Sequence, residues 1–171
     1  MKRQISSWCW IFIALIFIAG CASTTRPTSR NDQNISSWQG RLSMHVQPDP
    51  ADPQSQPQSF SAAFDLQGDA QQGSLNFYTP LGSTAAVIRW TPESAQLTAR
   101  GETHQFNGLA PLTIHMLGTE VPVTAFFSWL KGQSLTAAGW DVDLTQFNQG
   151  KITAQRLTPA PEAQLRVILD N

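Results

Sequence analysis

Charged side chains are scarce in this chain of 171 residues: Asp, Glu, Lys and Arg together make up 13% of it, about half of their usual share in a soluble domain. The eleven basic residues are scattered. The lack of a basic stripe that could follow a phosphate backbone excludes a nucleic-acid-binding protein. No apolar run reaches the roughly 18 to 20 residues that a membrane-crossing helix needs. Gln, Ser and Thr supply much of the polar surface, which favours β-structure over long exposed helices.

Cysteine is also rare, and one of the two cysteines follows what reads as a secretory signal. Lys2 and Arg3 precede an apolar run, residues 8–19, and then Gly20 and Cys21. Basic residues, a short apolar segment and small residues in this order are typical of a secretory signal. A cysteine directly after them resembles the bacterial lipoprotein cleavage box, in which a peptidase cuts before the cysteine and lipid is attached to its thiol and new amino terminus. An ordinary cleaved signal is the alternative.

We therefore predict three parts: a lipoprotein signal peptide (residues 1–20), a lipidated flexible tether (residues 21–34) and a single folded domain (residues 35–171). After Cys21 the tether has no apolar side chain larger than alanine, so it cannot bury enough surface to order itself. Loss of two of the eleven basic residues with the signal leaves nine basic and twelve acidic residues, a formal charge of −3. Cys9 is lost as well, so no intramolecular disulfide can form.

The domain is predicted to be mainly β, because apolar and polar residues alternate in short runs separated by turn residues. In the first run, Leu42, Met44 and Val46 alternate with polar residues. Residues 47–58 contain four prolines and form a long hairpin loop. Nine short runs with hairpin-length links imply one antiparallel, strongly curved sheet. The predicted strands are 38–46, 60–66, 74–78, 84–90, 95–99, 103–106, 140–144, 152–157 and 165–169.

Two segments in the middle of the chain are too apolar for surface loops and are predicted to be helices. Leu109–Leu117 and Val123–Leu130 both run into glycines, as helices often do. Pro122 suits the start of the second helix. Apolar residues cover most of its circumference, so it must be covered on more than one side. Two interpretations stay open: a helix that fills the open end of the sheet as core, or a lid over a cavity.

Several motifs, taken in order, resemble the LolB family of outer-membrane lipoprotein receptors. Residues 76–84 (NFYTPLGST) match a Pro-Leu-Gly turn between two strands, and residues 121–124 (VPVT) with 127–132 (FSWLKG) match a Pro-led helix that ends in Trp-x-x-Gly. The cleavage box, the first strand around residues 38–42 and the last strand around residues 163–167 also follow the order of the family. The resemblance covers essentially the whole predicted mature chain.

The resemblance implies a half-open antiparallel β-barrel around an apolar cavity, closed by a helical lid. Proteins of this family take acylated lipoproteins from a soluble LolA-like periplasmic carrier and place them in the outer membrane, and they use no nucleotide, metal or other cofactor. We expect a monomer, lipid-anchored on the periplasmic face of the outer membrane. Ala22 after the predicted lipidated cysteine fits outer-membrane sorting by the rule known for enteric bacteria.

The resemblance also implies that Leu81, between Pro80 and Gly82, is the exposed leucine that inserts into the membrane during delivery of the cargo. A leucine at a turn apex is difficult to pack, and leaving it exposed forgoes about 1.5–3 kcal/mol of burial. That energy is too small to anchor a protein by itself, so we interpret Leu81 as a probe that enters lipid headgroups locally. An ordinary surface leucine is the alternative.

Apolar residues on the predicted inner face could line the cavity. Each acyl CH₂ withdrawn from water is worth about 0.8 kcal/mol, so acylated cargo needs an apolar container at every stage of its passage. Lining and ordinary core use the same residue types, and both are expected in this set. The candidates are Trp38, Leu42, Met44, Phe60, Phe64, Leu75, Phe77, Val87, Ile88, Trp90, Ile114, Met116, Phe126, Phe127, Trp129 and Trp140.

The residues do not support an enzyme. His45, His104 and His115 are far apart in sequence, and no second cluster of ligands completes a metal site. Asp141 and Asp143 lie on one strand face without an acid–base partner, and no Gly-x-Ser-x-Gly elbow is present. Two alternatives to a receptor remain: a lipoprotein that binds free lipid or glycolipid without protein cargo, and a structural envelope lipoprotein with a filled core.

Overall fold

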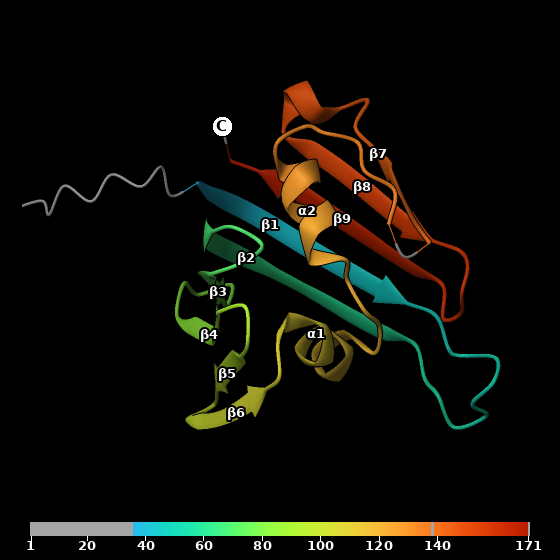
Figure 1. The fold of residues 1–171 in the computed structure, drawn as a ribbon, viewed down its shortest axis with the longest axis horizontal. Coiled ribbons are helices and arrows are strands. Elements are labelled where there is room, and N and C mark those ends of the chain that lie inside the picture. The colour runs from blue at the N-terminus through green and yellow to red at the C-terminus, as the bar shows by residue number, and fades with distance from the viewer. Residues whose placement is uncertain (1–35, 138, 171) are drawn as a thin grey trace, which may run out of the picture. The chain divides into compact units, whose positions relative to one another are not determined.

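A computed structural model describes residues 36–137 and 139–170. The predicted signal peptide, the predicted tether and Cys21 lie outside these residues. The described strands form one sheet (Figure 1). Two α-helices separate its last three strands from the others along the chain, and a short 3₁₀-helix lies between the first two of these three strands. The strands are β1 (Ser37–Val46), β2 (Gln58–Gly68), β3 (Gly73–Tyr78), β4 (Thr84–Trp90), β5 (Ala95–Ala99), β6 (Glu102–Phe106), β7 (Trp140–Asp143), β8 (Lys151–Arg156) and β9 (Ala163–Leu169). The helices are α1 (Leu109–Leu117), α2 (Val123–Leu130) and the 3₁₀-helix η1 (Phe147–Gln149).

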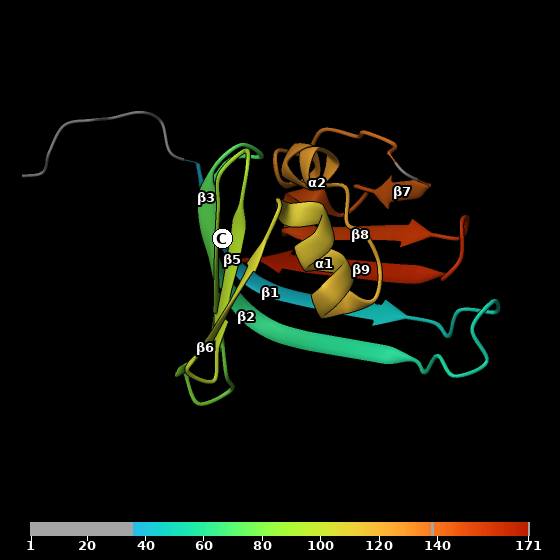
Figure 2. The same ribbon diagram turned by 60° about the horizontal axis from the view of Figure 1, so that its bottom comes forward.

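The sheet is an open, antiparallel half-barrel. Its strand order is β6-β5-β4-β3-β2-β1-β9-β8-β7, and each neighbouring pair is antiparallel. In the described part of the chain β6 and β7 do not pair, so the barrel does not close. Figure 2 shows that β3, β5 and β6 run across the direction of β1, β2, β8 and β9, and that both helices lie inside this bend. The predicted fold class is confirmed.

The predicted strands and helices are confirmed, with small differences at their ends. β2 begins at Gln58, two residues earlier than predicted, and β7 ends at Asp143, one residue earlier. The short helix η1 has no counterpart in the prediction. The proline-containing loop after β1 carries local structure, because Asp49 accepts the N–H of Ala51 at 2.9 Å and Asp52 accepts that of Gln54 at 2.9 Å. Such side-chain turns order a polar loop that has no apolar core of its own.

The core lies between the inner face of the sheet and the two helices. In β1, Leu42, Met44 and Val46 are buried and alternate with residues that remain accessible, as the pleat requires. β8 and β9 alternate in the same way. α2 buries Phe127, Trp129 and Leu130, so it is covered on more than one side. It fills the open side of the half-barrel as core, and part of it also faces the pocket described below.

Gly40 of β1 is a position where two strands come unusually close. A Cβ added there would overlap with the main-chain oxygen of Ile168 on β9, and backbone atoms cannot move aside without breaking the pairing of β1 with β9. We predict that Gly40→Ala lowers the free energy of unfolding by about 2 kcal/mol or more. Urea denaturation measures this loss. Gln39→Ala, at the exposed neighbouring position, is the control, and equal stability of the two variants would contradict the prediction.

Candidate functional site

An apolar pocket lies between the helices and the inner face of the sheet. Its lining comes from β1 to β4, from β9 and from both helices, and Thr113 contributes the one side chain that is not purely hydrophobic. Ten of the sixteen predicted cavity residues line it: Leu42, Met44, Phe60, Leu75, Phe77, Ile88, Trp90, Met116, Phe126 and Phe127. The structure thus brings these residues together around one space, and their contact with acyl chains stays a prediction.

The other six candidates do not line this pocket. Phe64 is buried where β2 pairs with both neighbouring strands, and Val87 points to the face of β4 opposite Ile88. Ile114 is 51% exposed on α1. The remaining three are tryptophans: Trp129 belongs to α2, and Trp38 and Trp140 pack against this helix.

Helix α1 supplies a wall of the pocket that the sequence analysis missed. Five of its residues line the pocket: Leu109, Leu112, Thr113, Met116 and Leu117. They recur at helical spacing, three and four residues apart, and so form one face of the helix. That periodicity is the signal that could have identified them, and it also explains why the candidate Ile114 lies outside the pocket.

The pocket is small in this conformation. Its volume is about 90 Å³, whereas pockets that hold small-molecule ligands usually measure about 300–1,000 Å³. It is therefore too small for a long acyl chain unless one of its walls moves. The two helices that form walls of the pocket differ in the contacts that hold them, and these contacts determine how readily each helix can move.

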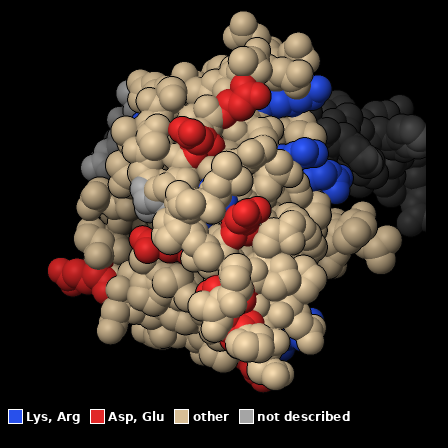
Figure 3. Space-filling model, turned by 90° about the vertical axis from the view of Figure 1, so that its right-hand side faces the viewer, with Lys and Arg blue, Asp and Glu red and all other residues tan. Residues whose placement is uncertain are grey.

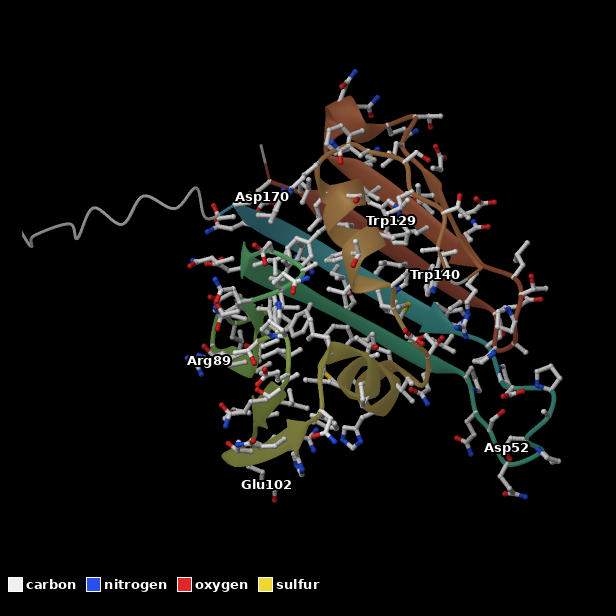
Figure 4. The ribbon with its side chains drawn as sticks, viewed as in Figure 1. Asp52, Arg89, Glu102, Trp129, Trp140 and Asp170 are labelled. Carbon is white, nitrogen blue, oxygen red and sulfur yellow. The ribbon has the colours of Figure 1, made fainter. Side chains whose placement is uncertain are left out.

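Helix α2 and its flanks are held by three indole N–H groups. Nε1 of Trp38 donates to the carbonyl oxygen of Leu130 at 3.1 Å, Nε1 of Trp129 to that of Leu135 at 2.8 Å, and Nε1 of Trp140 to that of Glu120 at 3.1 Å. Trp129 and Trp140 have no exposed surface, and Figure 4 shows Trp129 on α2 with Trp140 close to this helix. Moving α2 would leave buried hydrogen-bonding groups without partners, which is costly.

Helix α1 is held differently. Among the described residues, no side-chain hydrogen bond joins α1 to the sheet; the hydroxyl of Thr113 donates to Ala110 within the helix and accepts the N–H of Val121 at 3.3 Å. Leu112 is its one buried residue. The helix is bounded by Gly108 and Gly118, the latter in the left-handed conformation. Apolar contacts around the pocket and the packing of the His115 ring against Phe106 of β6 thus hold α1 without a side-chain hydrogen bond to the sheet. We expect α1 to be the wall that moves at the lower cost.

The linker between the helices contains a further weak point. The hydroxyl oxygen of Thr119 is buried and has no hydrogen-bond partner, and Thr119 is 3% exposed. A buried hydroxyl without a partner is unfavourable in the folded state. Because Thr119 directly follows Gly118, this cost lies at the end of α1, where a movement of the helix could relieve it.

Among the described residues, Arg156 is the one charged residue that is buried. It is 6% exposed, and its Nε and Nη2 atoms both donate to the carbonyl oxygen of Pro161. Burial lowers the pKa of the Arg156 guanidinium, and the nearby Glu120 partly opposes this shift. The guanidinium also lies 6.0 Å from the ring centre of Trp140. These contacts hold the turn between β8 and β9 and make Arg156 part of the framework around α2.

Charge on the outer surface is sparse and mixed. Figure 3 shows scattered acidic side chains on the end of the molecule that faces the viewer, with basic side chains towards one margin and no basic stripe. In the described part of the chain, no three His, Cys, Asp or Glu side chains are arranged to hold a metal ion. Nor is any helix there both long and apolar enough to cross a membrane.

The turn between β3 and β4 presents Leu81 to solvent. The N–H of Gly82 donates to the carbonyl oxygen of Thr79 at 2.9 Å, and the N–H of Thr79 to that of Ser83 at 2.8 Å. Gly82 has a positive φ of 82°, which completes a tight three-residue hairpin loop. Leu81 is 96% exposed, more than any other large apolar side chain described. The loop geometry therefore holds an apolar side chain clear of the protein surface.

A comparison with protein families shows to which family the chain belongs. The model of the family described as "Outer membrane lipoprotein LolB" matches residues 37–157, from β1 to the end of β8. The chain belongs to the LolB family. An outer-membrane lipoprotein LolB from Bordetella pertussis (strain Tohama I) is 31% identical, with 93% of this chain and 89% of the relative aligned. LolB of Dechloromonas aromatica (strain RCB) is 29% identical over 79% of each chain.

The family assignment confirms the resemblance found in the sequence. The Pro-Leu-Gly turn, the Pro-led helix and the first strand that carried it all lie within the matched residues. In this LolB-family chain the turn is the loop that exposes Leu81, and the Pro-led helix is α2.

We predict that α1 opens more readily than α2. Because α1 lacks side-chain hydrogen bonds to the sheet, its amides should exchange with solvent through local opening, whereas those of α2 require wider unfolding. Native-state hydrogen exchange should show exchange at least about tenfold faster for residues 113–117 than for residues 127–130. Equal protection of the two helices would contradict this assignment of the movable wall.

Proposed function

We propose that this LolB-family protein is an outer-membrane lipoprotein receptor. In this proposal, lipid on Cys21 anchors the protein to the periplasmic face of the outer membrane. The apolar pocket accepts the acyl chains of lipoproteins from a LolA-like periplasmic carrier, and the protein then inserts the cargo into the membrane. It acts without catalysis and without nucleotide. The family match supports this role, and so do the relatives named as outer-membrane lipoproteins.

The observation that carries the proposal is an apolar pocket with one loosely held wall. Acyl chains gain about 0.8 kcal/mol for each CH₂ that leaves water, so the pocket lining is a suitable environment for them. Because the pocket volume is about 90 Å³, the pocket must enlarge during loading, and in this proposal α1 swings outward. When the pocket is empty, α1 closes and covers the lining residues. Loading thus replaces the contacts between α1 and the sheet with contacts of the acyl chains to α1 and to the sheet.

The same small volume is the observation that favours the alternative of a structural lipoprotein with a filled core. The two functions differ in whether the pocket can enlarge. A structural protein would bind neither lipid nor acylated cargo, whereas a carrier of free lipid would bind lipid but take no cargo from a loaded carrier. Transfer of an acylated lipoprotein from the loaded periplasmic carrier to the purified protein is therefore the experiment that tests the proposal.

A charge inside the pocket should prevent acyl binding. Met116 lines the pocket and Ile114, two residues away on the same helix, is 51% exposed. We predict that Met116→Asp weakens binding of a fluorescent fatty acid at least about tenfold, because the carboxylate would be buried against hydrocarbon. Ile114→Asp is the matched control and should bind within about twofold of the unchanged protein. Fluorescence titration measures both, and equal binding by the two variants would place acyl chains elsewhere.

Leu81 is proposed to act at the delivery step. Its side chain projects from a tight turn that is independent of the pocket lining. Entry of one leucine into the apolar part of a membrane is worth about 1.5–3 kcal/mol. An energy of this size is suited to a brief, reversible contact during which the cargo leaves the pocket.

We predict that Leu81→Glu folds normally and accepts cargo from the loaded carrier but delivers it to outer-membrane vesicles about tenfold more slowly or worse, since 1.36 kcal/mol corresponds to a factor of ten in rate. Leu157→Glu is the matched control, because Leu157 is also exposed, at 64%, but lies in the turn after β8. Acceptance and delivery are followed separately by co-purification and by vesicle flotation. Normal delivery by the Leu81 variant, or an equal defect in both variants, would remove this role.

A further inference from the structure

Two histidines outside the pocket lining meet at the contact between α1 and the edge of the sheet. His115 lies in the last turn of α1 and His104 lies on the edge strand β6. Their ring centres are 6.0 Å apart, and the ring of His115 also packs 5.2 Å from that of Phe106. Both side chains are exposed, 51% in the case of His104. The ten residues between them in sequence hid this pair from the analysis of spacing.

The geometry points to a two-histidine site for a divalent transition-metal ion such as Zn²⁺. Two imidazoles that bind one ion, each with a metal–nitrogen distance of about 2.0–2.1 Å, place their ring centres about 5–6 Å apart. The observed distance needs little adjustment to meet this requirement, and both rings are accessible enough to turn towards an ion. Neutral imidazole suits Zn²⁺, Cu²⁺ and Ni²⁺ better than Mg²⁺ or Ca²⁺. Water would occupy the remaining coordination positions.

Glu102 completes the surroundings of the site. Its Oε2 atom lies 3.6 Å from Nε2 of His104, and its side chain is 78% exposed. A carboxylate beside a ligand imidazole orients the ring and makes it a stronger ligand. No basic side chain of the described residues forms an ion pair with Glu102, so its charge is available to favour a cation. Glu102 and His104 alternate on one face of β6 and His115 approaches from α1, so the carboxylate supports a site whose two protein ligands are the histidines.

Such an ion would tie the movable wall of the pocket to the sheet. α1 has no side-chain hydrogen bond to the sheet among the described residues, so a bond from His115 through the metal to His104 would be its strongest polar link. Metal binding stabilises the conformation in which both ligands are in place, and here that is the closed conformation of α1. The ion therefore acts as a latch that slows opening of the pocket; this consequence rests on the proposed function, whereas the site itself does not.

The test uses Zn²⁺ alone, added to the purified protein, with Mg²⁺ as the control ion. His104→Gln and His115→Gln should each bind Zn²⁺ at least tenfold more weakly than the unchanged protein. His45→Gln is the matched control, because it removes the third histidine of the chain, which is bound to Ser59 on the outer face of the sheet. In the unchanged protein, the histidine ring signals of His104 and His115 should shift together on titration.

The latch is tested by release of a hydrophobic dye. Zn²⁺ should slow dye release at least threefold in the unchanged protein and in His45→Gln, and should have no effect in His115→Gln. Equal Zn²⁺ affinity in all the variants would overturn the site. Binding through the pair with unchanged dye release would overturn the latch. A failure of the receptor proposal is recognised separately, by the absence of cargo transfer from the loaded carrier with or without Zn²⁺.

Discussion

Three indole N–H groups, each donating to a main-chain oxygen, hold α2 over the inner face of the open sheet. This uncovered face is the weakest part of a half-barrel. A closed barrel fills its interior with side chains from all of its strands, but an open sheet has an inner face that must be covered by something else. Here α2 covers it, and Trp38, Trp129 and Trp140 secure the helix and both of its flanks. The stability of the fold and the rigidity of one side of the pocket have this common origin.

The other side of the pocket follows a different principle. α1 contributes one apolar face and few polar contacts, so its attachment depends mainly on apolar burial, which is not directional, with the ring of His115 packed against Phe106 at the edge of the sheet. An apolar guest can replace that burial without leaving donors or acceptors unpaired. We therefore expect any change in the size of the pocket to involve α1, while the sheet and α2 keep their positions.

Alternation of apolar residues predicted the strands, and the glycines and prolines around 109–132 predicted both helices, because these patterns depend on local geometry. The division of apolar residues into pocket lining and core could not be predicted. Phe64 and Phe77 have the same side chain and both lie on inner strand positions, yet only Phe77 lines the pocket. The indole hydrogen bonds of Trp38 and Trp140 and the meeting of His104 with His115 join segments that only the fold brings together. Composition and spacing therefore do not reveal them.

The open sheet ends in two edge strands, β6 and β7. The polar composition of these edges affects how copies of the protein contact one another when they are crowded. β6 exposes Glu102, Thr103, His104 and Gln105 in succession, and β7 is only four residues long and carries Asp141 and Asp143. Short, hydrophilic margins resist zipping of one copy onto another. At high density, copies of this protein can thus lie side by side without joining their sheets into one continuous sheet, even though the half-barrel of each copy is open.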